Sequence, residues 1–295
     1  MNRKIDYKIN ENDTGKTVEG FLKERGYTHQ VLVRLKQTDH GILRNGIWTY
    51  TNERLCKDDL ITVQIVENEC SDNIAPVNLP LDIAYEDDDI IVINKPFDMP
   101  AHPSAGNHDN TLANALMYYY GSQNKPFVYR CINRLDRDTT GLTIVAKHAL
   151  AGGILGNAVA KRAIHRTYYA VCSGCTPACM RISAPIARKD ASTIERGVDF
   201  KRGENAVTDF IRIKYNPDNN LSLVKLRLLT GRTHQIRVHM KYIGFPLIGD
   251  FLYNPDYTYI SRQALHSGRL VFTHPVTGQK MNLISDIPSD MKSLF

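Results

Sequence analysis

A run of predicted strands with no helix between them is the feature that most limits the fold of this chain. Strand-like segments cover residues 166–173, 180–186, 206–214 and 221–229, and turn residues separate them. Consecutive strands joined by short turns pair antiparallel, whereas parallel pairing needs long crossover connections. The chain is therefore predicted to be an α+β protein with a mixed, mainly antiparallel sheet.

Other elements are predicted on both sides of this run. Residues 233–243 have apolar Ile236, Met240 and Ile243 at helical spacing. The remaining predictions are a hairpin at 83–93, a helix from 110 to 120, a buried strand at 142–146, a helix near 150–158 and a final hairpin that turns at 275–278.

The first 68 residues are predicted to form a small separate domain. Two short helices, at 14–25 and from Thr28, precede an Asn45-Gly46 hairpin turn and a strand at 60–66. This order resembles the small RNA-binding domain named after a ribosomal protein of the small subunit, although few basic residues line the second helix. A folded extension without RNA contact is the alternative. Residues 69–80 are predicted to be a linker, and residues 81–295 the main domain.

The basic residues of the chain are concentrated beyond residue 100. Residues 101–295 hold 25 Lys/Arg against 13 Asp/Glu, a net charge of +12, whereas residues 1–70 carry no net charge and residues 71–100 carry −6. A local basic excess favours a polyanionic partner, because phosphate contacts release condensed counterions. Many basic domains bind no nucleic acid, so the charge alone leaves the partner open.

The chain shows no membrane or secretion signal. No apolar run approaches the ~20 residues of a membrane span, and the N-terminal residues MNRKIDYKINEND lack the apolar core of a signal peptide. Six cysteines in 295 residues do not suggest a disulfide framework, which is a device of short secreted domains. We therefore expect a cytoplasmic protein with reduced thiols and no membrane partner. A monomer is the default expectation for its oligomeric state.

Three segments carry candidate chemistry. The first, NRLDRDTTG at residues 133–141, places two acids directly before an apolar strand, either to orient a carboxylate or as a simple Asx-type turn. The second is HRTYYAV at 165–171, where strand alternation sends Tyr168 and Tyr169 to opposite faces. The third, LTGRTHQIRVH at 229–239, has Gly231 for a sharp turn, with Thr233 expected to cap the following helix.

Together the segments NRLDRDTTGL, HRTYYAVCSG and LLTGRTHQIRVHM, in this order, resemble the signature motifs of the RluA family of pseudouridine synthases. The step Ile93-Asn94-Lys95-Pro96 resembles the strand that opens the catalytic domain of that family. The resemblance covers about residues 80–290, and it implies the pseudouridine synthase fold and the isomerisation of uridine in RNA. Ribosomal RNA is the favoured substrate, and transfer RNA is the second.

The resemblance assigns roles to individual residues. Asp136 corresponds to the catalytic carboxylate, and Tyr168 to the tyrosine that stacks on the target base. Arg232 corresponds to the arginine that forms an ion pair with the aspartate, and Arg134 to the one that fills the space of the flipped nucleotide. Other basic residues of the motifs are candidates for RNA contact: Lys95, Arg137, Arg166, His234 and Arg237. Asn133 and His165 depart from the usual residues at their positions, which affects the expected RNA contacts and substrate choice rather than the reaction.

The chemistry agrees with these residue types. Uridine isomerisation breaks the glycosidic bond, rotates the uracil and rejoins it through carbon 5, so no redox step or hydrolysis occurs and no cofactor or metal is expected. A carboxylate serves as nucleophile or stabilises a cationic sugar, and a neighbouring arginine keeps it ionised. Two other classes of function remain: a non-catalytic RNA-binding or ribosome-assembly protein on the same fold, and a metal-dependent hydrolase.

Possible metal ligands are interpreted as structural residues. Cys172, Cys175 and Cys179 provide three thiols without a fourth ligand close in sequence, and His234 and His239 are five residues apart and so face different sides of a helix. The acidic run at 86–89 is expected to be a solvated hairpin turn. A set of basic residues on predicted loops is expected to face RNA phosphates, with a solvated surface as the alternative: Arg188, Lys189, Arg196, Lys201 and Arg202.

Overall fold

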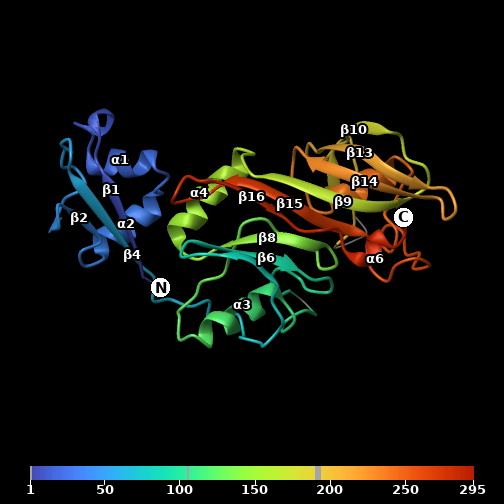
Figure 1. The fold of residues 1–295 in the computed structure, drawn as a ribbon, viewed down its shortest axis with the longest axis horizontal. Coiled ribbons are helices and arrows are strands. Elements are labelled where there is room, and N and C mark those ends of the chain that lie inside the picture. The colour runs from blue at the N-terminus through green and yellow to red at the C-terminus, as the bar shows by residue number, and fades with distance from the viewer. Residues whose placement is uncertain (1, 105, 190–193) are drawn as a thin grey trace.

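The N-terminal part of the computed structural model, which describes residues 2–104, 106–189 and 194–295, is a small sheet with two helices on it (Figure 1). The strands run in the order β1-β4-β2-β3. Thr17 and Thr28 cap the two helices through their side chains, so the first helix begins three residues later than predicted. The strand β1 was not predicted. The bounds are β1 Asn2–Lys8, α1 Val18–Glu24, α2 His29–Gln37, β2 Ile42–Arg44, β3 Ile47–Trp48 and β4 Leu60–Val66.

The rest of the chain is built on a ten-stranded sheet, which confirms the α+β prediction. Its main path is β10-β13-β14-β9-β15-β8-β6-β5, with β16 beside β15 and β7 beside β8. The pair β8–β15 is parallel and its other pairs are antiparallel. The bounds are β5 Ile83–Glu86, β6 Ile90–Lys95, β7 Arg130–Cys131, β8 Thr140–Ala146, β9 His165–Ser173, β10 Cys179–Ser183, β13 Val207–Asn216, β14 Leu221–Leu228, β15 Leu265–Thr273 and β16 Lys280–Ile284.

Among the described residues, four α-helices accompany this sheet: α3 Leu112–Gly121, α4 Ala149–Ala160, α5 Gln235–Tyr242 and α6 Ser289–Lys292. Helix α5 places Ile236 and Met240 in a core with Tyr168 and Leu226 of the strands. Helix α3 packs on the other part of the sheet, next to β6 (Figure 1). The site described below lies beside the α5 core.

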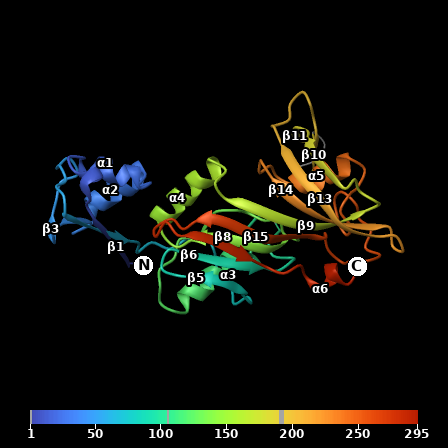
Figure 2. The ribbon, with the colours of Figure 1, turned by 45° about the horizontal axis from the view of Figure 1, so that its top comes forward.

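The predicted strand at 180–186 is two strands rather than one. Pro185 separates β10 from β11 (Ile186–Arg188), which pairs with β12 (Arg196–Val198) in a small sheet of its own. Because proline donates no backbone N–H group, it interrupts a strand at this point. The two-stranded sheet is near β10 and α5 in Figure 2.

The N-terminal sheet and its helices contact the larger part directly. Arg3 of β1 donates to both carboxylate oxygens of Asp89, at 2.7 and 3.1 Å, and Arg130 pairs with Glu67 at 2.8 Å. Leu150 of α4 is buried in the core of the N-terminal part, a burial that contributes about 1.5–3 kcal/mol. The division at residues 68 and 81 stays a prediction. Within the described ranges, no helix has the length and apolar character that a bilayer crossing requires.

Candidate active site

The loop that carries Asp136 is held to the sheet by two buried side chains. Asn133 accepts the N–H of Ile144 at 2.8 Å and donates to the carbonyl of Leu142 at 3.2 Å. Lys95 donates to the carbonyls of Pro96 and Arg137, at 2.7 and 2.8 Å. Burial lowers the pKa of Lys95 to about 7. Both residues therefore fix the backbone on either side of Asp136.

A glycine allows this loop to enter the sheet. Gly141, with φ of +105°, is on β8 where this strand runs parallel to β15, and a Cβ there would lie 2.3 Å from the carbonyl oxygen of Ser267. No other residue fits so close an approach at this backbone conformation. Packing therefore requires the glycine at the end of this motif.

Asp136 forms an ion pair with Arg237 of α5. The Nη1 group of Arg237 is 3.0 Å from Oδ2 of Asp136, while its Nε and Nη2 groups donate to Asp250 at 2.7 and 2.8 Å. Burial alone would lower the pKa of Arg237, but the hydrogen bond with Asp250 and the charges of both carboxylates raise it. The side chain of Asp136 keeps 30 % of its surface exposed, whereas Asp250 is fully buried. One carboxylate is thus open to solvent and the other supports the arginine.

The prediction that Arg232 pairs with Asp136 is wrong. Arg232 forms its ion pair with Glu204 and donates to the carbonyl of Asn205 at 3.2 Å. The reason is its place before the helix, at the strand-to-helix corner, whereas Arg237 is in the first turns of α5 and faces inward. Arg232 still lines the same cleft as Asp136.

The corner before α5 is closed by Gln235 and not by the predicted Thr233 cap. The side-chain oxygen Oε1 of Gln235 accepts from the Thr230 hydroxyl and the Arg232 backbone N–H, at 2.7 and 3.0 Å. Its side-chain Nε2 donates to the Thr208 hydroxyl of β13 at 2.9 Å. The N-cap position belongs to His234, which makes no capping bond and has a left-handed φ of +56°. Such a conformation is uncommon outside glycine and costs energy that the surroundings must supply.

His234 faces Asp136 and is held from behind by Tyr253. Its Nε2 is 4.0 Å from Oδ2 of Asp136, and its Nδ1 is 3.0 Å from the hydroxyl of Tyr253. That hydroxyl also accepts the backbone N–H of Arg196 at 2.9 Å. Burial lowers the pKa of His234, so the imidazole is favoured in its neutral form. Tyr253 thereby joins the imidazole to strand β12.

These side chains open into a cleft of about 990 Å³. Asp136 is the one carboxylate among the described residues that line it. Tyr168 also lines the cleft, and most of its ring is buried in the core with Leu135 and Ile236. Seven arginines line it as well: Arg134, Arg162, Arg166, Arg196, Arg227, Arg232 and Arg237. The arrangement suits a polyanionic ligand that presents one reactive group to Asp136.

Two predicted RNA contacts lie outside the cleft lining. Lys95 is buried under the loop, and Arg137 pairs with its neighbour Asp138 at 3.0 Å. Arg134, Arg166, His234 and Arg237 do line the cleft, as does Arg196 from the predicted basic loop. Sequence reasoning missed Asp250 and Tyr253, whose GDFLY segment carries a buried acid and an aromatic residue but no spacing that relates them to Asp136.

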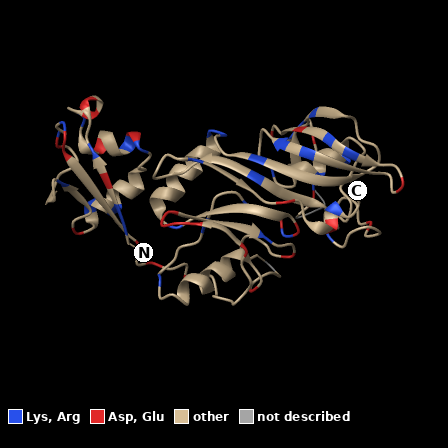
Figure 3. Ribbon diagram, in the orientation of Figure 1, with Lys and Arg blue, Asp and Glu red and all other residues tan. Residues whose placement is uncertain are grey.

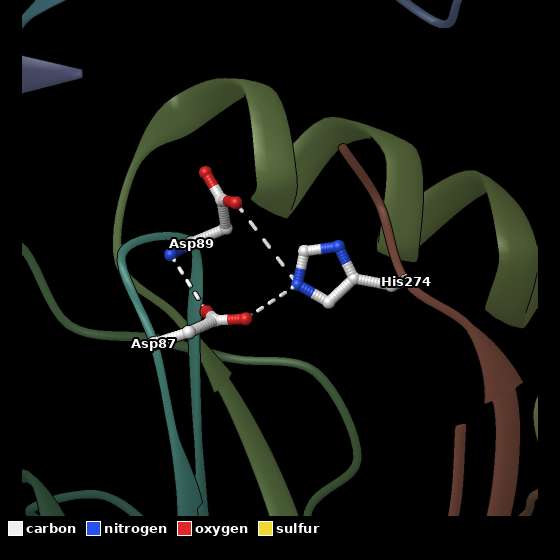
Figure 4. Close-up of side chains that lie close together, drawn as sticks. All are labelled: Asp87, Asp89 and His274. Atoms are coloured by element: carbon white, nitrogen blue, oxygen red, sulfur yellow. Dashed lines mark hydrogen bonds and ion pairs between the residues drawn. The ribbon is translucent and has the colours of Figure 1, made fainter. Parts of the chain in front are cut away.

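The acidic run at 86–89 is not the solvated turn that was expected. Asp87 accepts from His274 Nε2 at 2.8 Å, and Asp89 accepts from His148 Nε2 at 2.8 Å as well as from Arg3. Figure 4 shows Asp87, Asp89 and His274 close together, and they are the one group with metal-ligand geometry among the described residues. The Nδ1 atom of His274 accepts two backbone N–H groups, which leaves Nε2 as the protonated nitrogen and a donor to Asp87. The cluster is therefore a hydrogen-bonded ion-pair network.

Comparisons with known proteins agree with this geometry. Residues 89–242 match the family model described as RNA pseudouridylate synthase. A ribosomal large subunit pseudouridine synthase D of Haemophilus influenzae is 40% identical over 86% of this chain and 81% of its own length. The uncharacterized RNA pseudouridine synthase YjbO of Bacillus subtilis is 38% identical over 95% of this chain and 98% of its own length. The solved human RNA pseudouridylate synthase domain containing 1 has a TM-score of 0.59 at 25% identity, covering 70% of this chain and 83% of that one.

Proposed function

We propose that Asp136 is the catalytic carboxylate of this chain, which belongs to the RNA pseudouridylate synthase family and is an isomerase acting on RNA. We also propose that ribosomal RNA is its substrate. The observation that carries the first proposal is the position of Asp136, the one carboxylate among the described residues of an arginine-lined cleft. The names of several relatives as large-subunit enzymes support the second proposal.

The proposed mechanism assigns one task to each side chain. A uridine in structured RNA must leave the base stack to reach the cleft, at a cost of a few kcal/mol. Arg134 fills the vacated space and Tyr168 stacks on the extruded base. Asp136, whose Oδ2 is 3.0 Å from Nη1 of Arg237, attacks the sugar or the base or stabilises a cationic sugar.

The isomerisation needs no change in the composition of the nucleotide. The bond from N1 of uracil to C1′ of ribose breaks, the uracil turns, and a bond forms between C5 and C1′. The C5 proton is lost and N1 gains a proton, so the product has the same atoms as the substrate. His234, 4.0 Å from Asp136, is placed to make contact with the rotating base.

Arg232 keeps a proposed role in the cleft, as an RNA contact beside Glu204 rather than as the partner of Asp136. Lys95 is proposed to hold the loop from beneath, without contact to RNA. We also propose that residues 1–68 form a separate RNA-binding domain joined by residues 69–80 to the catalytic domain at 81–295, and that the enzyme is a cytoplasmic monomer without a cofactor.

Substitution of Asp136 by Asn tests the central proposal. The amide is nearly the same size but a poor nucleophile, so we expect turnover to be abolished while the fold and most of the RNA affinity remain. Pseudouridine is mapped by carbodiimide chemistry and sequencing on total RNA from cells without the gene, rescued by the wild type or by Asp136→Asn. Sites restored by the wild type alone identify the substrate and the carboxylate together. Restoration by both proteins would exclude Asp136 as the catalytic group.

A further inference from the structure

The strands at one end of the large sheet are strongly basic. Together β9, β10, β13, β14, β15 and β16 contain eight Lys/Arg and a single acidic residue, Asp209. Figure 3 shows Lys and Arg positions on several neighbouring strands in this part of the sheet. Not all of these residues belong to the Asp136 cleft, since only Arg166 and Arg227 among them line it. The others require a separate explanation.

Strand register places four charged residues, each from a different strand, in one row. Arg181 of β10 is opposite Asp209 of β13, which is opposite Arg227 of β14. Arg227 is opposite Thr167 of β9, and Thr167 is opposite Arg269 of β15. Residues paired across strands lie on the same face of a sheet. These five residues, called the basic row below, therefore run across five strands on a single face.

The basic row is on the face of the sheet opposite Tyr168. Alternation along β9 sends Thr167 and Tyr168 to opposite sides, and alternation along β14 does the same for Arg227 and Leu226. Tyr168 and Leu226 are buried in the core with α5. The row thus extends over a surface distinct from that core, while Arg227 also lines the cleft at the end of its strand.

The guanidinium groups of the row are available to a ligand. The side chain of Arg181 is 64 % exposed; its Nε and Nη2 groups donate to Asp209 at 2.6 and 2.8 Å, so its Nη1 group is the one left for a ligand. Arg269 donates to Asn282 and is exposed. For Arg227, which is also exposed, no hydrogen bond or ion pair occurs among the described residues. The arginines are on every second strand, and so are about 10 Å apart.

We propose that the basic row binds the phosphate backbone of the substrate RNA, beyond the nucleotides that enter the cleft. Three arginines against one carboxylate favour a polyanion, and guanidinium groups bind phosphate oxygens in a bidentate way. Because Arg227 belongs to both the row and the cleft lining, one strand of RNA reaches from Asp136 to the sheet face without leaving positive surface. The proposal deepens the proposed function and rests on RNA as the substrate.

The test compares a row variant with a matched control. The row variant carries Arg181→Glu and Arg269→Glu and leaves Arg227 intact, because Arg227 lines the cleft. The control carries Lys125→Glu and Lys292→Glu, which are exposed and lie outside the N-terminal residues 1–68, the row and the cleft lining. The same pair of arginines changed to Gln provides a second variant without charge reversal. Thermal unfolding of each protein confirms that the exposed substitutions leave the fold intact.

Binding is measured against a transcript of large-subunit ribosomal RNA and against a short hairpin that occupies the cleft alone. For the transcript we expect the row variant to raise Kd about tenfold and to reduce the slope of log Kd against log salt by about 1.4–1.8, the value of two phosphate contacts. For the hairpin, Kd and the single-turnover rate should equal those of the wild type. The control should match the wild type on both RNAs.

Equal Kd and equal salt slope for row variant and control would overturn the proposal, and would leave an acidic protein as the partner to seek for this face. The result is separable from the proposed function, because binding of the transcript does not require turnover. One possible outcome is that the wild type forms no pseudouridine in the transcript, while the row variant binds the transcript more weakly than the wild type does. Ribosomal RNA is then not the modified substrate, and the basic row still binds RNA. If the wild type modifies the transcript and the row variant binds it as tightly as the wild type does, only the proposal for the basic row is wrong.

Discussion

Two ion-pair networks, each with a fully or almost fully buried carboxylate, occupy different regions of this molecule, and they resemble each other in composition. One joins Asp136, Arg237 and Asp250, and the other joins Asp87, Asp89 and His274 with Arg3. Each contains carboxylates whose charge is balanced by a cationic or hydrogen-bonding side chain. Charge clusters alone therefore do not distinguish a reactive site from a structural one.

The difference is what each network faces. Asp136 keeps 30 % of its side chain exposed in an arginine-lined cleft, whereas Asp89 is almost fully buried and spends both oxygens on Arg3 and His148. A carboxylate that is partly exposed in a cleft can react, whereas a buried carboxylate with both oxygens hydrogen-bonded can only hold parts of the structure together. The second network accordingly connects β1 to the hairpin of β5 and β6.

The largest expected effect on the two networks is at Arg237, the cation shared by Asp136 and Asp250. Substitution by Met keeps the volume but leaves Asp136 and the buried Asp250 without their shared cation, which costs about 3–5 kcal/mol. Single-turnover pseudouridine formation should fall by at least about a hundredfold. The matched substitution Arg232→Met removes an exposed pair worth about 0–1 kcal/mol, so its rate should change less than tenfold. A greater loss at Arg232 than at Arg237 would contradict the ion-pair assignment made here.

The second expected effect is on stability, at Asp89. Substitution by Asn leaves Arg3 and His148 without their anionic partner, and we expect the free energy of unfolding to fall by about 3 kcal/mol. Turnover of a short hairpin by the folded variant should stay at the wild-type value, since the cluster does not line the cleft. The exposed neighbour Asp88 provides the control, because Asp88→Asn removes only a 3.7 Å contact with Arg3.

The loss of unfolding free energy caused by Asp89→Asn should depend on pH. Burial alone would raise the pKa of Asp89, but hydrogen bonds from His148 and Arg3 outweigh it and hold the pKa below the ordinary value. A depressed carboxyl pKa adds stability above the unfolded value, near 4, and loses it as pH falls through the folded value. Urea unfolding of wild type and Asp89→Asn should thus differ most near neutral pH and converge below about pH 4. A difference independent of pH would show that packing rather than charge is responsible.

Local patterns predicted the elements of this fold well. Alternation and turn residues identify β9, β13 and β14, and Asn45-Gly46 forms the predicted hairpin turn with both residues at positive φ. The strand β1 was missed because NRKIDYK has few apolar residues, and its pairing with β4 depends on a partner about sixty residues away. Pairing over such a distance leaves no local pattern in the sequence.

The candidate site was predicted in part for the same reason. Asp136 and Tyr168 are in motifs long enough to be identified, and both line the cleft. The choice between Arg232 and Arg237 depends on how the corner before α5 turns, which the left-handed backbone of His234 and the buried Gln235 determine. Neither conformation is visible in residue types alone, so the ion pair was assigned to the wrong arginine.

The smallest expected effect concerns Tyr253, whose hydroxyl is 3.0 Å from Nδ1 of His234, the histidine beside Asp136. Tyr253→Phe removes its contacts with His234 and with the backbone N–H of Arg196 and keeps the ring. Loss of such hydrogen bonds costs about 1 kcal/mol, so kcat should fall about fivefold while KM for a short hairpin stays constant. Tyr257→Phe, at an exposed position, is the control. A rise in KM at constant kcat would instead assign Tyr253 to RNA binding, and an unchanged enzyme would show that His234 holds its position near Asp136 without this support.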